Sequence, residues 1–292
     1  MNQPPAPPDY FANLVDTVRL ALAEDLGGGA GDVDPAADIS AALIPAAAQA
    51  NAAVITREAA IVCGRPWVDE VFRQIDAQVA LHWQLAEGAE AAAGQVLVEI
   101  SGRARSILTA ERCALNFLQT LMGTATAARA YAKLAAGAPT RVLDTRKTLP
   151  GLRLAQKYAV KTGGCDNHRM GLYDAFLIKE NHIRACGGIA AVVARARQIA
   201  ADKPVAVEVE NLTELAEAQA AGADRILLDN FSAADCRRAL ARKRPGVAFE
   251  RSGNIDADSL CAVIGEGIDF VSSGALCKNV RAIDLSLRFE GA

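Results

Sequence analysis

Cationic side chains gather in one stretch of the sequence, residues 141–182. This stretch holds eight lysines and arginines against four acidic residues, in a chain whose formal net charge is −3. Two short apolar runs within it are followed by cations, the first by Arg146 and Lys147 and the second by Lys179. Arginine binds carboxylates and phosphates with two parallel hydrogen bonds, and lysine binds them as a point charge. We therefore expect these residues, with Arg169 of the loop between the runs, to bind a multiply charged anion.

Acidic side chains follow two later apolar runs. Glu208 and Glu210 are two residues apart on one expected strand, so we predict that both point to the same side of it, with Asp229 at the end of the next strand. Carboxylates that point into a protein interior are costly unless cations or a metal compensate them. Three carboxylates opposite a group of cations suit Mg²⁺, and mutual neutralisation of acids and bases without a metal is the alternative.

Small and polar residues offer a second kind of anion-binding surface. Gly163 and Gly164 precede Asn167-His168-Arg169 and allow backbone amides to approach a phosphate or carboxylate closely. Two further segments, Ser252-Gly253-Asn254 and Ser272-Ser273-Gly274, end the last two expected strands. Late strands of α/β barrels commonly bind phosphate in this way, so we predict a phosphate-binding surface there.

The elements that position these residues alternate between short apolar strands and amphipathic helices. This alternation predicts a parallel sheet, either doubly wound or closed as a barrel. The barrel is favoured because every strand ends in polar residues, whereas a doubly wound sheet needs such ends only at its switch point. The predicted strands are residues 141–144, 175–179, 205–210, 225–229, 248–253 and 270–274. The predicted helices between and after them are residues 187–201, 213–221, 232–242 and 256–265.

The first part of the chain has a different pattern. Apolar residues alternate with polar ones at 79–85, as expected for an antiparallel sheet buried on one face, with His82 on the solvent face. The closing segment 283–290 also alternates and is predicted to return to this sheet. The sequence predicts strands within 51–63, 78–86 and 96–100, and helices over 11–26, 66–76 and 107–136. This part is therefore expected to be a small α+β domain.

Composition excludes several classes of protein. With 51% hydrophobic and 22% charged residues, the 292-residue chain can form a substantial core. A pI near 5.7 and the lack of a basic arm argue against a nucleic-acid partner. No apolar run reaches the length of about 18 residues that a membrane span needs. Seven scattered cysteines without a CxxC motif indicate free thiols in a reducing cytoplasm.

Two motifs together resemble the quinolinate phosphoribosyltransferase family, DTRKT at 144–148 and NHRMGLYDAFLIKENH at 167–182. The resemblance extends through ERCALN (111–116), VEVEN (207–211), LLDNF (227–231), ERSGNI (250–255) and VSSGALCK (271–278). It implies an N-terminal α/β sandwich domain over 1–118, joined by 279–292, and an incomplete, seven-stranded α/β barrel over 119–278. The chain departs from the family pattern at Cys165, where a third glycine is frequent, and at Ser273, where valine is usual.

The resemblance also implies an activity. The enzyme would transfer a phosphoribosyl group from 5-phosphoribosyl 1-diphosphate to quinolinate, yielding nicotinate mononucleotide, diphosphate and CO₂ in de novo NAD biosynthesis. It would require Mg²⁺ and act as a cytoplasmic homodimer with a shared active site. Three alternatives stay open: a related phosphoribosyltransferase with another acceptor, like the paralogue found near molybdate-transport proteins; a Schiff-base lyase that uses Lys179; and a non-catalytic sensor of phosphorylated ligands.

Residue roles follow from the same resemblance. The catalytic residues would be Lys147, Lys179, Glu208 and Asp229. Arg112 would reach into the partner subunit's site and, with Arg146, His168, Arg169 and Lys179, hold the two carboxylates of quinolinate. Thr145 and Lys147 would contact substrate, with Lys147 on the sugar diphosphate. Glu208 and Asp229 would serve Mg²⁺, directly or through water, and the ribose hydroxyls. The segments Ser252-Gly253-Asn254 and Ser272-Ser273-Gly274 would hold the 5-phosphate.

Overall fold

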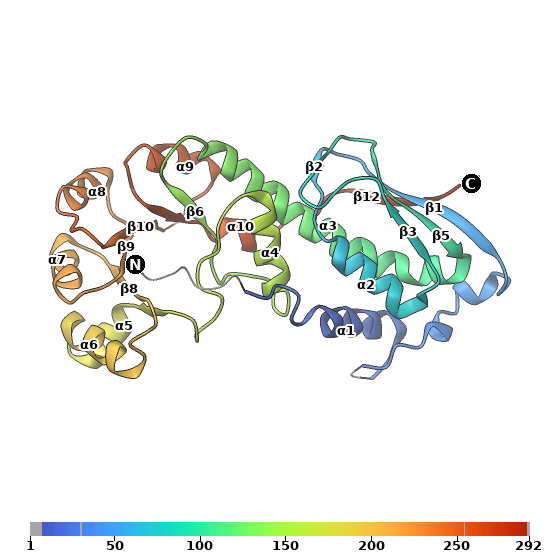
Figure 1. Cartoon of the computed structure of the whole chain (residues 1–292), viewed down its shortest axis with the longest axis horizontal. Helices are drawn as coiled ribbons and strands as arrows, with labels where there is room; N and C mark the ends of the chain where they lie inside the picture. The colour runs from blue at the N-terminus through green and yellow to red at the C-terminus, as the bar shows by residue number, and fades with distance from the viewer. Residues whose placement is uncertain (1–7, 30, 254, 291–292) are drawn as a thin grey trace. The chain divides into compact units, whose positions relative to one another are not determined.

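The structure is a computed structural model that describes residues 8–29, 31–253 and 255–290. The chain divides into two compact units (Figure 1). The first unit comprises residues 1–129, 149–164 and 280–292, and the second comprises 130–148 and 165–279. The chain therefore crosses between the units several times, and each unit contains segments that are far apart in sequence. No helix in the described ranges is both long enough and apolar enough to span a membrane.

A four-stranded antiparallel sheet is the centre of the first unit. Its strand order is β12-β1-β5-β3, and Val54 pairs with Leu287 on one side and Val98 on the other. Its strands are β1 (Gln49–Thr56), β3 (Ala80–Trp83), β5 (Val96–Arg103) and β12 (Leu285–Phe289). The prediction that segment 283–290 returns to this sheet is therefore confirmed, and His82 is exposed as predicted.

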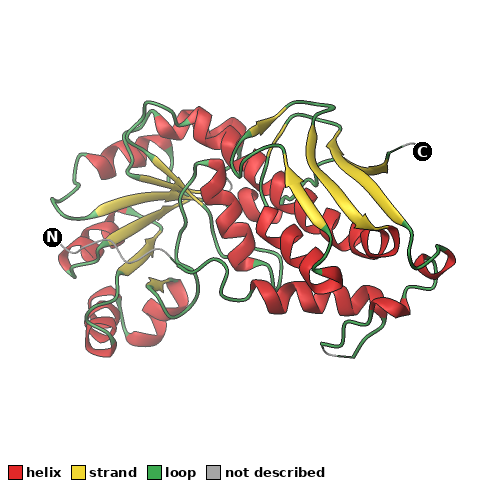
Figure 2. Ribbon diagram, turned by 45° about the vertical axis from the view of Figure 1, so that its right-hand side comes forward, coloured by secondary structure: helices red, strands yellow, loops and turns green. Residues whose placement is uncertain are grey.

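Helices cover one face of this sheet and bury its apolar side chains (Figure 2). Trp67 and Phe72 of α2 and Leu118 of α3 are almost completely buried in this core. The α-helices of this unit are α1 (Leu14–Leu26), α2 (Arg65–Asp76), α4 (Arg153–Gly163) and α3 (Ala104–Leu134), the last of which continues into the second unit. Shorter elements are the 3-10 helices Pro35–Ala37 and Ala41–Leu43 and the strand pair β2 (Ala60–Ile61) and β4 (Glu90–Ala91).

A six-stranded parallel sheet forms the second unit, in the order β6-β11-β10-β9-β8-β7. The six strands predicted from the sequence are all present: β6 (Arg141–Leu143), β7 (Phe176–Ile178), β8 (Val205–Val209), β9 (Arg225–Asp229), β10 (Ala248–Ser252) and β11 (Phe270–Ser272). A parallel bridge from Leu143 to Asp166 adds a further position beside β6. All neighbouring strands of this sheet are therefore parallel, as an incomplete α/β barrel requires.

Helices lie around the strands of this unit (Figure 1). They are α5 (Glu180–Cys186), α6 (Ile189–Ile199), α7 (Leu212–Ala220), α8 (Ala233–Leu240), α9 (Ala257–Ile264) and α10 (Ala275–Lys278). Helix α5 was not predicted from the sequence. The helix predicted for 187–201 is confirmed as α6, but it begins only at Ile189, because Gly187 and Gly188 both have positive φ angles, 83° and 120°. This left-handed backbone ends α5 and separates it from α6.

Candidate active site

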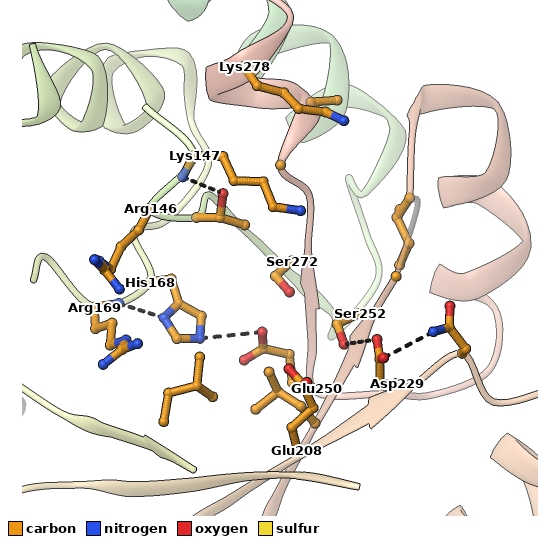
Figure 3. Close-up of a pocket in the computed structure, with 18 of the residues that line it drawn as sticks. Arg146, Lys147, His168, Arg169, Glu208, Asp229, Glu250, Ser252, Ser272 and Lys278 are labelled. Atoms are coloured by element: carbon orange, nitrogen blue, oxygen red, sulfur yellow. Dashed lines mark hydrogen bonds and ion pairs between the residues drawn. The ribbon is translucent and has the colours of Figure 1, made fainter. Parts of the chain in front are cut away.

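The carboxyl ends of the parallel strands surround a cavity of about 570 Å³ (Figure 3). Most of the residues predicted to bind substrate line it: Thr145, Arg146, Lys147, His168, Arg169, Lys179, Glu208, Asp229, Ser252, Gly253, Ser272 and Gly274. Residues from six strands or the loops that follow them therefore meet in one place. This is the arrangement expected of an α/β barrel, in which the loops after the strands form the site.

A buried carboxylate fixes the loop that carries His168 and Arg169. Asp144 is completely buried at the end of β6, and its carboxylate accepts hydrogen bonds from the backbone N–H of His168 (2.8 Å) and from Asn167 Nδ2 (2.7 Å). Farther along the loop, Asp174 accepts hydrogen bonds from two backbone N–H groups, at 2.6 and 3.0 Å. The loop is therefore held by carboxylates at both ends.

Two arginines from different loops form the cationic side of the cavity. Arg169 donates a hydrogen bond from Nη1 to the carbonyl of Ala175 at 3.2 Å, which directs its side chain. Burial lowers the pKa of Arg169, and the neighbouring charge of Arg146 lowers it further. Like charges held together in a partly buried site destabilise each other, so an anion that binds between them relieves this repulsion. Figure 3 shows both guanidinium groups beside His168.

Lys179 and Glu208 form an ion pair across two neighbouring strands. Lys179 Nζ lies 2.6 Å from Glu208 Oε2, and their side chains are 49% and 19% exposed. Lys179 directly follows β7 and Glu208 lies near the end of β8, whose residue Val207 pairs with Ile178. The parallel register therefore brings the two side chains together, and it leaves the lysine the more accessible partner.

Asp229 and Ser252 lie next to each other, away from Arg146 and Arg169 (Figure 3). Ser252 donates from Oγ to Asp229 Oδ1 at 3.2 Å, and Asn230 donates from Nδ2 to Asp229 Oδ2 at 3.0 Å. Gly253 has φ of 97°, and a Cβ there would lie 2.7 Å from Asn230 Oδ1. Glycine is therefore required at this position, both for the backbone conformation and for the space.

Lys147 passes over Gly274, the last glycine of the predicted phosphate-binding segments. A Cβ at Gly274 would lie 2.8 Å from Lys147 Cδ, so the missing side chain makes room for the lysine. Thr145 Oγ1 accepts a hydrogen bond from the Lys147 backbone N–H at 3.1 Å and shapes the turn after β6. Ser273, in contrast, is buried and donates from Oγ to the carbonyl of Ile255 at 2.6 Å. Its side chain is not part of the cavity lining, so its contact with substrate stays a prediction.

Two predicted ligands are placed elsewhere or not described. Arg112 is an exposed residue of α3 in the first unit and does not line this cavity. Asn254 lies outside the described residues.

The expectation that Glu210 faces the same side as Glu208 is wrong: β8 ends at Val209, and Glu210 is exposed, with its N–H bound to Glu214 Oε2 at 2.9 Å. The alternation of a strand does not continue into the turn that begins α7.

Sequence reasoning missed Glu250 and Lys278, which also line the cavity. Glu250 is completely buried in β10, 2.9 Å from Arg225 Nη1 and 3.5 Å from His168 Nε2. Burial raises its pKa, but the contact with His168 and the charge of Arg225 outweigh burial and lower the pKa overall. Little in the sequence distinguishes Glu250, because Arg251 and Ser252 follow it directly at a polar strand end. Lys278 follows the small-residue segment on α10, and a lysine near a helix end gives no distinctive signal.

The donors present would fit a magnesium ion whose remaining ligands are water and substrate oxygens. Glu208 and Asp229 both line the cavity and supply carboxylate oxygens, the ligands that Mg²⁺ prefers. Within the described ranges, no group of three or more His, Cys, Asp or Glu side chains is arranged to hold a metal ion. Two carboxylates beside a cation-rich surface are the donor set expected where phosphate oxygens complete the coordination.

The fold and the cavity define an α/β-barrel enzyme that binds anionic substrates. More specifically, the chain belongs to the quinolinate phosphoribosyltransferase family: the family model of the N-terminal domain matches residues 38–122, and that of the C-terminal domain matches residues 124–288.

Relatives and solved structures agree with this assignment. The nicotinate-nucleotide pyrophosphorylase (carboxylating) of Mycobacterium leprae is 37% identical over 280 residues, covering 93% of this chain and 95% of that protein. The decarboxylating quinolinate phosphoribosyltransferase 1 of Nicotiana glauca is 34% identical over 99% of this chain and 85% of its own length. The structure of the nicotinate-nucleotide pyrophosphorylase from Francisella tularensis superposes with a TM-score of 0.90 at 46% identity, over 99% of this chain and all of that one.

Proposed function

We propose that this chain is a nicotinate-nucleotide pyrophosphorylase (carboxylating) that converts quinolinate and 5-phosphoribosyl 1-diphosphate into nicotinate mononucleotide, diphosphate and CO₂. The observation that carries the proposal is the composition of one cavity. Arg146, Arg169 and Lys179 would supply positive charge for a dicarboxylate, and Asp229 and Ser252 would supply acceptors and donors for a ribose phosphate. The names of the relatives favour quinolinate over another acceptor.

The transfer requires a positioned acceptor and a stabilised leaving group. The pyridine nitrogen attacks C1′ of the ribose as the bond to diphosphate breaks, and positive charge develops on the sugar. Arg146 and Arg169 hold the dianionic acid in line, which converts an encounter of two molecules into a step within one complex. Lys147 also lines the cavity and would neutralise charge on the diphosphate. No covalent enzyme intermediate is needed, and the arrangement supplies positioning and electrostatic stabilisation.

Decarboxylation follows from the charge of the product ring. The alkylated pyridine nitrogen is cationic, and the carboxylate next to it leaves as CO₂. The electron pair of the broken bond stays on the ring carbon beside that positive charge and then takes up a proton. The residues of the cavity contribute by keeping the carboxylate oriented, and burial near Leu177 and Leu227 limits its solvation.

A magnesium ion is proposed as the cofactor, held by Glu208 and Asp229. When bound, it would neutralise charge on the diphosphate. The two side chains also have roles without it: Glu208 orients Lys179, and Asp229 orients Ser252. Omission of Mg²⁺ is expected to abolish turnover, while quinolinate still protects the enzyme against heat.

The proposed homodimer with a shared site rests on Arg112. This arginine is exposed on α3, and from the family resemblance we expect it to reach into the partner subunit's site. Mixing two inactive variants, Arg112→Ala and Lys179→Ala, is expected to restore part of the activity, because mixed dimers contain one intact site. A mixture that stays inactive, while gel filtration shows subunit exchange, would contradict the shared site.

The most direct test of the activity is product analysis by mass spectrometry. With 5-phosphoribosyl 1-diphosphate and Mg²⁺, quinolinate should give nicotinate mononucleotide and CO₂ in equal amounts, and nicotinate should give no product. Product from nicotinate alone would instead show a different acceptor. The Schiff-base alternative predicts trapping by borohydride at Lys179, which the ion pair with Glu208 disfavours because a charged ammonium is not a nucleophile.

A reducing compartment such as the cytoplasm is proposed as the location. All seven cysteines are free thiols, and five of them are buried. A chain of this kind needs no oxidising environment to fold.

A further inference from the structure

A buried carboxylate of β10, Glu250, faces His168, one of the residues that line the cavity. Glu250 is at the centre of β10, with no solvent exposure, and it lies between Arg225 and His168. Arg225 Nη1 lies 2.9 Å from Glu250 Oε2, and His168 Nε2 lies 3.5 Å from Glu250 Oε1. The two oxygens of one carboxylate are thus directed to different partners. A buried charge of this kind is tolerated only where it is paired.

The other ring nitrogen of His168 also faces a protein group. The backbone N–H of Arg169 donates a hydrogen bond to His168 Nδ1 at 2.7 Å. A nitrogen that accepts a hydrogen bond carries no proton, so the proton of the neutral ring is on Nε2, directed to Glu250. His168 Nδ1 is therefore held by the hydrogen bond from Arg169, and Nε2 faces Glu250 Oε1 at 3.5 Å, a contact longer than an ordinary hydrogen bond (Figure 3).

From this geometry we infer that Glu250 is a positioning residue for the reaction: with Arg225 behind it, it fixes the tautomer and orientation of His168, and through His168 the start of the Arg169 segment. Only the effect expected on quinolinate turnover rests on the proposed function; the effect expected on the His168 ring does not. Glu250 acts through its neighbours, and the pairing with Arg225 holds it ionised.

The substitution Glu250→Gln tests this arrangement because it changes charge but hardly changes volume. Arginine has only donors, so Arg225 requires the amide oxygen of the new glutamine. The amide –NH₂ group then faces His168 Nε2 and needs an acceptor there. The proton of the ring must therefore move to Nδ1. There it would face the N–H of Arg169, so that two hydrogen-bond donors point at each other. The result is either the other tautomer or a rotated ring.

Nitrogen-15 NMR of the histidine rings reads this change directly. The chain has only three histidines, so the His168 signals can be assigned by their loss in His168→Gln. The wild type should show a neutral Nε2–H ring at His168, and Glu250→Gln should lose that pattern. An unchanged pattern in a folded Glu250→Gln protein would overturn the inference. This reading is independent of turnover, so it stands even if quinolinate proves not to be the substrate.

Steady-state kinetics provide the second reading. Because one mismatched buried hydrogen bond is introduced, kcat/KM for quinolinate should fall by about tenfold to a hundredfold in Glu250→Gln. The change should appear in the quinolinate KM and in kcat, while the KM for 5-phosphoribosyl 1-diphosphate stays within about twofold of the wild type. Equal losses for both substrates would indicate general damage and would contradict a positioning role.

A second substitution restores the arrangement and separates positioning from folding. In the double variant Glu250→Gln/Arg225→Met, no arginine competes for the amide oxygen, so it can turn to His168 Nε2–H. The Nε2–H pattern and most of the lost kcat/KM should return. Glu70→Gln is the matched control, since Glu70 is a nearly buried glutamate bound to Arg73 at 2.6 Å in the first unit. Glu70→Gln should change neither the His168 NMR signals nor kcat/KM for quinolinate. If the folded double variant regains neither the Nε2–H pattern of His168 nor kcat/KM, the inference is rejected.

Discussion

Lys179 Nζ lies 2.6 Å from Glu208 Oε2, at the ends of the neighbouring strands β7 and β8. The ammonium group is the more exposed partner, so an incoming carboxylate reaches it without separating the pair. Glu208 thus fixes the position of a cation whose free side faces the cavity. This relationship gives the acid-binding side of the site a defined geometry before substrate binds.

Removal of this cation should affect the acid substrate most. Lys179→Ala is expected to lower kcat/KM for quinolinate by about a hundredfold or more, because a charged contact to the reacting molecule is lost and Glu208 keeps an uncompensated charge beside it. Initial-rate measurements at saturating 5-phosphoribosyl 1-diphosphate check this. Lys203→Ala is the control, since Lys203 pairs only weakly with Asp202, at 3.6 Å in an exposed turn. Full activity of Lys179→Ala would refute the site assignment.

Loss of the Asp229 carboxylate should affect the sugar diphosphate rather than the acid substrate. In Asp229→Asn the hydrogen bonds from Ser252 and Asn230 lose their charged acceptor. The expected result is a KM for 5-phosphoribosyl 1-diphosphate about tenfold higher, and more Mg²⁺ needed for half-maximal rate, with the KM for quinolinate nearly unchanged. Asp202→Asn, in an exposed turn, should behave as the wild type. An unaltered Mg²⁺ dependence in Asp229→Asn would remove this residue from the proposed metal site.

A methyl group added at Gly274 tests whether the position of the Lys147 side chain matters for the reaction. In Gly274→Ala the new Cβ would lie 2.8 Å from Lys147 Cδ, so the lysine must move. We expect kcat to fall about tenfold with little loss of stability, because the side chain that moves is long and flexible. Gly265→Ala is the matched control, since the nearest atom to its Cβ lies 3.9 Å away. If both variants keep wild-type kcat, Lys147 has no fixed role in the reaction.

The sequence predicted the parts of the site that depend on strand ends. Strand–helix alternation indicated the parallel sheet, and in a parallel sheet the carboxyl ends of all strands lie on the same edge. Arg146, Lys179 and Asp229 could therefore be brought together without coordinates. Glu210 was placed wrongly because the pattern does not show where β8 stops.

Glu250 could not be recognised for a different reason. Its importance depends on Arg225 and His168, which lie 25 and 82 residues away in the sequence, on another strand and in a loop. Pairing between β9 and β10 places Arg225 opposite Ala248 and so brings its side chain within reach of Glu250. In the sequence Glu250 is one of three consecutive polar residues, and its burial and its partners become known only from the fold.

The closing strand of the first unit offers a pH-dependent test of stability. Glu58 accepts hydrogen bonds from Arg281 Nη1 at 3.0 Å and from the backbone N–H of Asp284 at 3.1 Å, and so fixes the segment before β12. The Arg281 hydrogen bond, with the Asp284 N–H, lowers the pKa of Glu58 below its usual 4.5. A carboxyl group whose pKa is lower in the folded state stabilises the protein above its unfolded-state pKa, and that stabilisation is lost as the pH falls through the folded value.

Glu58→Gln should therefore reduce the free energy of unfolding of this unit at pH 7 by about 1 kcal/mol or less, as is usual for exposed pairs. The difference from the wild type should shrink as the pH falls below 4.5 and vanish at lower pH, where Glu58 is protonated in both states. Urea unfolding followed by fluorescence checks this, because both tryptophans, Trp67 and Trp83, belong to the first unit. Glu99→Gln, at an exposed position of β5, should show no such pH-dependent difference. A difference for Glu58→Gln that persists unchanged into acid would mean that the contact does not stabilise this unit through its charge.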